Sequence, residues 1–542
     1  MADDYSPSSA EPLLSSKQIS YPSPPPSSIV SEDNVDNDTE DQNITFNYGP
    51  RPFRDLPFSI LFLVLLLSTF SFGIFSIVHR NPDASNVSSF AYSHNTTSCR
   101  HLISFSTTTT TTTSTTSSIK YLIWTLVVSL LLTGPLALSL LWLLRHYAKQ
   151  LVYAMLPFFL LIPIFFNVYW FVACTVSSQC THAFQLPYRI LLLVFVFLII
   201  GIVVWILVAN WHRIELTVRI IGVASNALAS NLGLFAVLPC LTFALLVYFV
   251  PIVVFLVFAR FNGKIVPHES KQGSEGVVSC VWKQDPWVPA YYTLAILTML
   301  WSAAAMVEAQ VFVTSGTIAQ WYFSKEHSRP SRSIRTSLRN AFGPSFGTVC
   351  FSGLLICVAR VVRAAVDTAK REDAAPGIVS LILRCCVNAL LSAVDFLNKF
   401  TINFAAITGE GYWSSAKMTY ELLKRNLLSA VFVETVSTRI LGGIIFVLSA
   451  VYAIAVCAVL KAVSNLGVDA YFVAILAGLL LIVVLGFFVH VLDNVIDTVY
   501  VCFAIDRDKG EVCKQEVHEV YVYLPISRNN RPSLATRTPL SV

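Results

Sequence analysis

The chain has 542 residues, of which 55% are apolar and 13% are charged, and its formal net charge is +5. A soluble domain carries about 25% charged residues, so this chain would leave large apolar surfaces uncovered in water. The positive charge is too small and too dispersed to predict a nucleic-acid-binding protein. The composition therefore predicts a membrane protein whose solvent is the lipid bilayer.

The first fifty residues differ from the rest of the chain. Residues 1–50 are rich in Ser, Pro and acidic side chains and show little apolar periodicity. Such a composition is typical of disorder, and the segment has no leading apolar stretch that would act as a cleaved signal peptide. We expect a disordered tail that stays in the cytosol.

Ten mostly apolar stretches follow, each long enough to cross about 30 Å of hydrocarbon as a helix. They cover residues 56–78, 119–144, 151–174, 188–209, 235–259, 290–314, 344–366, 377–407, 427–460 and 470–503. This predicts an all-α, polytopic membrane protein with about ten transmembrane helices in residues 51–508 and a cytosolic tail over 509–542. An even number of spans places both termini on one side, which we predict to be the cytosol.

Basic side chains favour the cytosolic side of a membrane. The strongest cluster lies between the sixth and seventh spans and contains Lys325, Arg329, Arg332, Arg335 and Arg339. Loops on the opposite side also carry basic residues, among them Arg260, Lys264, Lys271 and Lys283. The predicted orientation therefore rests mainly on the first cluster.

The first predicted outer loop contains two glycosylation motifs. Asn86 and Asn95 each begin an Asn-X-Ser/Thr motif in a segment that ends in a threonine run at 107–113. The same motif occurs at Asn37 and Asn43 in the tail predicted to be cytosolic. We predict glycosylation at Asn86 and Asn95.

Four of the twelve cysteines lie in or beside predicted outer loops, where the surroundings are oxidising. These are Cys99, Cys174, Cys180 and Cys280, and four cysteines allow three pairings. The remaining cysteines lack the paired Cys/His spacing of a zinc site. We therefore expect no metal and no cofactor.

Residues 211–234 alternate apolar positions such as Ile214, Val218 and Ile221 with charged ones such as Arg213 and Arg219. This periodicity predicts an amphipathic helix on the cytosolic interface. Two interpretations stay open: a helix packed under the bundle, or one that senses lipid.

Ionisable groups inside spans are costly, so they mark candidate functional sites. In the sixth span, Trp301, Glu308 and Phe312 share one helical face. An indole and a carboxylate two turns apart could bracket a small organic cation. The alternative is that Glu308 pairs with a buried Arg or stays protonated, while Trp301 only packs.

Two later spans also carry polar groups. In the eighth, Asp395 and Lys399 are four residues apart and can pair, with Asn403 nearby, and these groups either hold helices together or form part of a site. In the tenth, His490, Asp493 and Asp497 form a polar stripe that either lines a transport pathway and carries protons or holds neighbouring helices. We predict Trp301, Glu308, Phe312 and Asn403 as substrate-binding residues and the stripe as a coupling pathway.

Four segments resemble the choline transporter-like family. They are Ser315-Gly-Thr-Ile-Ala-Gln-Trp-Tyr-Phe323, Ser337-Leu-Arg-Asn-Ala-Phe-Gly-Pro-Ser-Phe-Gly347, the run from Cys385-Cys386 through Phe396-Leu-Asn-Lys399 to Ser415-Ala-Lys417, and Ile496-Asp-Thr-Val-Tyr-Val-Cys-Phe-Ala-Ile-Asp506. Their order and spacing are similar to the family's, and the short loops resemble its compact fungal and plant branch. The resemblance implies a ten-helix transporter with cytosolic termini that moves choline or a related small cation.

The chain departs from the family pattern around the eighth span. Phe400-Thr401-Ile402 and Thr408-Gly409 stand where the family has tyrosines, and Glu308 stands where a small or amide residue is expected. The resemblance therefore implies the architecture more directly than the ligand.

We predict a facilitated or voltage-driven transporter of choline or a related small organic cation, in the plasma membrane or alternatively an endomembrane such as the vacuole. The alternative is a non-transporting scaffold or trafficking protein, with Glu11-Pro-Leu-Leu14 read by cytosolic sorting proteins. A channel filter motif is not visible. Phosphate-loop, nucleophile-elbow and zinc-protease motifs are also missing from the sequence, so an enzyme is not expected.

Overall fold

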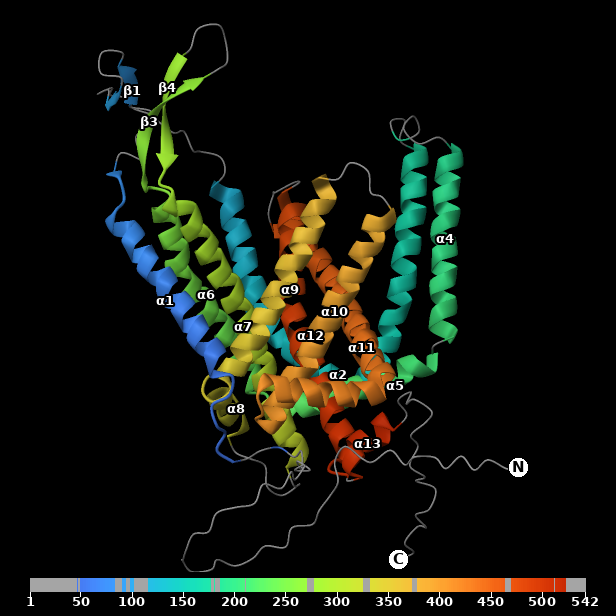
Figure 1. The fold of residues 1–542 in the computed structure, drawn as a ribbon. Helices are drawn as coiled ribbons and strands as arrows, with labels where there is room; N and C mark the ends of the chain where they lie inside the picture. Colours follow the sequence, from blue (N-terminus) through green and yellow to red (C-terminus); the bar gives the residue numbers. More distant parts are fainter. Residues whose placement is uncertain are drawn as a thin grey trace, which may run out of the picture.

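The computed structural model describes residues 46, 49–82, 90–93, 98–101, 116–176, 180, 186–209, 211–270, 277–324, 332–372, 378–463, 469–510 and 512–522. Predicted features at Asn86, Asn95, Lys325, Arg329 and in the tail 1–45 lie outside these residues. The fold is a bundle of long helices that carries a small β-structured cap at one end (Figure 1).

Ten long helices make up most of the described chain. They are α1 (Leu56–Val78), α2 (Thr116–Val176), α4 (Leu186–Ala209), α5 (Trp211–Ala229), α6 (Leu234–Ala259), α7 (Trp287–Phe323), α9 (Phe346–Glu372), α10 (Ile378–Thr408), α11 (Tyr412–Val463) and α12 (Asp469–Lys509). Two short helices, α8 (Ser333–Ala341) and α13 (Gln515–Tyr521), lie at the end of the bundle opposite the cap.

Nine helices in the described residues are long and apolar enough to cross a membrane. One of them, α2, has 61 residues, which would extend roughly 90 Å as a straight helix, three times the thickness of the hydrocarbon. Its backbone leaves helical geometry at Tyr147, so α2 contains both predicted spans 119–144 and 151–174. The predicted all-α fold with about ten transmembrane helices is confirmed.

The spans differ in how much of their surface other helices cover. The most apolar window of α7 is 61% buried, since α7 packs against α6, α9, α10 and α12. The corresponding window of α4 is 0% buried, and side chains such as Leu191, Phe195 and Trp205 point outward. In a bilayer, α7 is therefore the central helix and α4 faces lipid.

Helix α5 lies crosswise at the base of the bundle, below the spans (Figure 1). Val218, Ile221 and Ala224 are buried beneath α2, α11 and α12, while Arg219 stays on the exposed side. The predicted amphipathic helix is confirmed, in the form that packs under the bundle.

Two antiparallel hairpins form the cap. Strands β1 (Phe90–Ser93) and β2 (Ser98–His101) make one hairpin, and β3 (Gly263–Ser270) and β4 (Val277–Gln284) make the other. A β-carbon at Gly263 would lie 2.4 Å from the Lys283 carbonyl oxygen, which is why glycine begins β3. Disulfides join Cys99 to Cys280 and Cys174 to Cys180, which selects one of the three open pairings.

The chain enters α1 at the face opposite the cap, where a polar junction holds it (Figure 1). Arg51 donates to the Ala406 carbonyl oxygen at 2.9 Å, and burial lowers the pKa of Arg51 to about 10, so it stays charged at neutral pH. Asp55 accepts from Thr348 and from the backbone N–H of Tyr412, both at 2.7 Å. Because α13 packs on α5 at this same face, the described chain begins and ends on one side.

Candidate functional site

Glu308 lies at the meeting point of four helices. Its carboxylate accepts a hydrogen bond from Ser352 of α9 at 2.8 Å, and Ser352 lies 3.0 Å from the side-chain oxygen of Asn398 on α10. Tyr412 of α11 donates to the same Asn398 oxygen at 2.7 Å. Within the described residues no ion pair reaches Glu308, so the predicted alternative of a buried arginine partner is not found there.

Trp301 lies two turns from Glu308, and both its ring and its N–H group contact neighbouring helices. Its indole N–H donates to the Cys350 carbonyl oxygen at 2.9 Å, and its ring meets the ring of Phe62 edge-on at 5.3 Å. Phe312 is buried in a different apolar cluster from that of Trp301. The two aromatic side chains predicted to bind substrate are therefore held in separate packing clusters on the two sides of Glu308.

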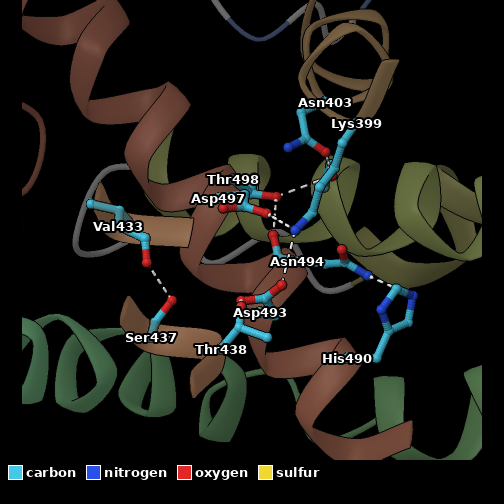
Figure 2. Close-up of polar contacts among 11 residues, drawn as sticks. Lys399, Asn403, Val433, Ser437, Thr438, His490, Asp493, Asn494, Asp497 and Thr498 are labelled. Carbon is cyan, nitrogen blue, oxygen red and sulfur yellow. Dashed lines mark hydrogen bonds and ion pairs between the residues drawn. The ribbon is translucent and has the colours of Figure 1, made fainter. Parts of the chain in front are cut away.

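A second polar centre surrounds Lys399, the residue of α10 that follows Asn398 of the first centre. Figure 2 shows its ammonium between Asp493 and Asp497 of α12. The nitrogen lies 2.9 Å from Asp493, whose other oxygen accepts a hydrogen bond from Thr438 of α11 at 2.8 Å. This Lys399 cluster, formed by Lys399, Asp493, Asp497 and Thr438, joins α10, α11 and α12.

The pair that the spacing allows between Asp395 and Lys399 does not form in the structure. Asp395 forms an ion pair with Arg363 of α9 at 3.2 Å, and Lys399 forms one with Asp493 of α12. The spacing of four residues permits an intrahelical pair worth only about 0.2–0.5 kcal/mol. A lysine that lies between two carboxylates of a neighbouring helix is stabilised more than one that pairs within its own helix.

Asn403 belongs to the α12 side of the site and not to the Glu308 centre. Its side-chain oxygen accepts from Ser315 of α7 at 2.6 Å, and Thr498 of α12 donates to the Ser315 hydroxyl at 3.0 Å. The amide nitrogen of Asn403 is buried and has no hydrogen-bond partner among the described residues. Its N–H donors are therefore available to a ligand or water at the contact of α7, α10 and α12.

Of the predicted polar stripe His490, Asp493 and Asp497, only the two aspartates act together in the structure. Asp493 and Asp497 both pair with Lys399, whereas His490 lies about one turn before Asp493 on α12 and approaches the Asn494 amide at 3.4 Å (Figure 2). His490 is therefore beside the Lys399 cluster and outside its ion pairs.

A pocket of about 770 Å³ opens beside the Lys399 cluster. Its walls come from α9, α10 and α11 and comprise Arg363, Ser392, Asp395, Phe396, Lys399, Thr435, Thr438, Arg439, Gly442 and Gly443. Two of the wall residues, Lys399 and Thr438, belong to the Lys399 cluster. The pocket therefore connects the outer surface of these helices with buried charge.

Ser352, Tyr412 and Thr438 complete the two polar centres, and sequence reasoning did not select them. Ser352 lies near the middle of its span, where a hydroxyl commonly bonds its own backbone. Tyr412 precedes the apolar stretch of α11. Their roles depend on helix contacts that local spacing does not reveal.

Together these features define a multi-pass helical membrane protein whose interior holds an ion-paired cluster around Lys399 and the buried carboxylate of Glu308. A family model described as plasma-membrane choline transporter matches residues 194–508, more than half of the chain. The chain therefore belongs to the choline transporter-like family, and the family's description is consistent with the plasma membrane.

Three relatives illustrate the similarity. A CTL-like protein of Dictyostelium discoideum is 23% identical over 239 residues, which cover 42% of this chain and 43% of that protein. Choline transporter-like protein 1 of Caenorhabditis elegans is 25% identical over 244 residues, 42% of this chain and 31% of that protein. Choline transporter-like protein 3 of Bos taurus is 26% identical over 317 residues, 55% of this chain and 46% of that protein. The chain thus matches less than half the length of each of these relatives.

Proposed function

We propose that this protein transports choline or a related small organic cation across the membrane. The observation that carries the proposal is Glu308, a buried carboxylate at the meeting point of four helices with which no described residue forms an ion pair. Lys399 pairs with Asp493 and Asp497 in the other polar centre. A buried carboxylate such as that of Glu308 is costly, and its charge becomes favourable when a cation binds to it.

The pocket beside Lys399 supports the same function. Its volume falls within the roughly 300–1,000 Å³ of small-molecule sites, and Phe396 offers a ring face that attracts a quaternary ammonium. In this proposal the cation contacts Glu308 and Asn403 at separate points of its path, since neither residue lines this pocket, and Trp301 and Phe312 hold α7 in place. His490, Asp493 and Asp497 line the pathway.

Membrane voltage supplies enough energy to concentrate a cation. One elementary charge gains about 2.3 kcal/mol per 100 mV, so facilitated uptake needs no coupled ion. Proton coupling through the carboxylates is the secondary form of this proposal.

We further propose that the cap faces the exterior and that both termini are cytosolic. Disulfides persist in oxidising surroundings. Cys99–Cys280 joins the two hairpins of the cap, and Cys174–Cys180 lies at the end of α2 on the same side of the bundle (Figure 1). Cysteine-accessibility labelling of an engineered Ser93→Cys in β1 and of Ser333→Cys in α8 on intact cells tests this. We expect labelling at position 93 alone, and labelling at position 333 alone would reverse the orientation.

Uptake of labelled choline into proteoliposomes tests the transport function, with Glu308→Gln compared with wild type. Glu215→Gln on α5 is the matched control, because it makes the same change in a partly exposed carboxylate at the base of the bundle. We expect uptake by wild type and by the control, and reduced uptake by Glu308→Gln. Wild type that moves no choline or related cation in any lipid composition would favour the scaffold alternative.

A further inference from the structure

The polar junction before α1 contacts two of the helices that also carry the Glu308 centre. The Asp55 carboxylate accepts hydrogen bonds from Thr348 of α9 and from the backbone N–H of Tyr412 of α11, both at 2.7 Å. Thr348 lies one turn before Ser352, so both hydroxyls project from one face of α9. Asp55 therefore holds α9 one turn from the serine that donates to Glu308.

Tyr412 connects the same junction to the interior of the bundle. Its backbone N–H donates to Asp55, and its phenol donates to the side-chain oxygen of Asn398 at 2.7 Å. Asn398 in turn lies 3.0 Å from the Ser352 hydroxyl, which donates to Glu308. A continuous series of polar contacts therefore leads from the segment before α1 to the buried carboxylate.

The segment of residues 51–55, which we name the strap, also holds α10. Arg51 donates to the Ala406 carbonyl oxygen near the end of α10 at 2.9 Å. Arg54 forms an ion pair at 3.1 Å with Glu410, which lies just after α10 ends. The strap therefore joins the ends of α9, α10 and α11 at the face opposite the cap (Figure 1).

The backbone of the strap is strained where it meets α1. Asp55 has φ 52° and ψ 36°, and among the described residues it is the one non-glycine residue with a positive φ. Such a conformation is uncommon for a residue with a side chain and persists only where surrounding contacts hold it. The contacts that hold Asp55 are polar, so water at this face can replace them when the strap moves away. The strap is therefore suited to reversible release.

Resting on the proposed transport function, we propose that the strap is the gate of the Glu308 centre at the face opposite the cap. The gate is closed in this structure, because the strap holds together the helix ends between which a cation would pass. Opening withdraws Asp55 from Thr348 and Tyr412, and this frees α9 and α11 to separate.

Maleimide labelling of buried cysteines in the purified full-length protein tests the gate without requiring transport. Cys350 of α9 is buried in an apolar cluster with Phe62 of α1, so it reports separation of these helices. Cys502 of α12 is buried in a different cluster and reports general loosening of the fold. The remaining free cysteines are replaced by alanine, and both disulfides are kept.

Three substitutions at Asp55 separate its carboxylate from its backbone. Asp55→Ala removes the acceptor, Asp55→Gly removes it but accepts the left-handed backbone, and Asp55→Asn keeps an oxygen for the two donors. The matched control is Asp285→Ala, which changes another partly buried aspartate just before a helix, at the cap end of α7.

We expect Asp55→Ala and Asp55→Gly to raise the labelling rate of Cys350 on the order of tenfold, which corresponds to about 1.4 kcal/mol. Asp55→Asn should raise it less, and Asp285→Ala should leave it unchanged. Cys502 should stay protected in every variant. Continued protection of Cys350 in Asp55→Ala, or an equal rise for Cys350 and Cys502, would overturn the gate.

A disulfide lock tests whether transport needs the gate to open. Asp55→Cys with Thr348→Cys joins two positions whose side chains are in hydrogen-bond contact. The matched control pair is Thr69→Cys with Thr298→Cys, because these hydroxyls lie 2.7 Å apart where α1 meets α7. We expect oxidation to abolish choline uptake into proteoliposomes for the first pair and to leave it unchanged for the control pair.

Uptake that persists in the oxidised first pair, or that is lost equally in both pairs, would overturn the gate while the proposed transport function stands. A wild type that moves no choline or related cation would overturn the transport function. The labelling of Cys350 would then still decide whether the strap controls access to the helices around Glu308.

Discussion

Two ion pairs in this molecule have the same geometry and different surroundings. Lys149 and Glu215 meet at 2.9 Å on the surface at the base, and Lys399 and Asp493 meet at 2.9 Å inside the bundle. The exposed fractions are 62% and 29% for the first pair, and 18% and 10% for the second. Surface pairs contribute little, whereas removal of one partner from a buried pair leaves a charge that nothing solvates. Two ion pairs with the same N–O distance can therefore differ in how much they contribute to the stability of the protein.

The largest effect is expected for Lys399→Met, which leaves Asp493 and Asp497 facing each other without an ammonium. Breaking a buried pair in this way costs about 3–5 kcal/mol. We expect a large fall in melting temperature, measured by scanning fluorimetry in detergent, and loss of choline uptake. Lys149→Met is the matched control, and an unchanged melting temperature for Lys399→Met would contradict the role given to the cluster.

The next effect tests whether the loss arises from uncompensated charge. Adding Asp493→Asn and Asp497→Asn to Lys399→Met replaces the cluster by neutral groups of similar size. We expect the triple variant to be more stable than Lys399→Met, with coupling of about 0.5–3 kcal/mol in a mutant cycle. Purely additive losses would show that packing, and not charge, gives the cluster its stability.

Glu308→Gln is expected to affect transport more than folding. The amide keeps the shape and the contact with Ser352, and it removes a buried charge that no described ion pair compensates. We expect uptake to fall on the order of tenfold, since a charged hydrogen bond contributes about 1.5–3 kcal/mol, while the melting temperature stays the same or rises slightly. Uptake unaffected by Glu308→Gln would remove this carboxylate from the proposed site.

The smallest effect is expected at the surface pair. Hydrogen bonding to Lys149 holds the pKa of Glu215 below its ordinary value, and Glu215 raises the pKa of Lys149. The pair therefore stays intact across neutral pH and is lost only as pH falls through the lowered pKa of Glu215 or rises through the raised pKa of Lys149. We expect Lys149→Ala to give no measurable change in melting temperature at neutral pH, and none that depends on salt. A strong salt dependence would show that this pair matters more than its exposure indicates.

Hydropathy alone predicted the spans well because lipid imposes its length on them. Residues 56–78 match α1 residue for residue, and 377–407 match α10 (Ile378–Thr408) within one residue. The sixth span was predicted to end at 314, whereas α7 continues to Phe323. Ser315 and Gln320 lower the local hydropathy, but Asn403 and Ser337 of neighbouring segments satisfy them.

The site was less predictable because its contacts lie between helices. Sequence spacing identified Glu308, Asp493 and Asp497 as costly groups, and all three are buried. The same spacing allowed Lys399 to pair with Asp395, since it cannot show that α12 packs against that face of α10. The cap strands were read as loops, although the β-branched residues of 277–284 were a usable signal for β4.

The link between Cys99 and Cys280 has a consequence for biosynthesis. The two cysteines are 181 positions apart in the sequence. Cys99 therefore has no partner thiol until the ribosome has synthesised α2, α4, α5 and α6. During this interval Cys174 and Cys180, only 6 positions apart, are already available to oxidation. Faithful maturation therefore requires that Cys99 not pair with these nearer thiols before Cys280 has been synthesised.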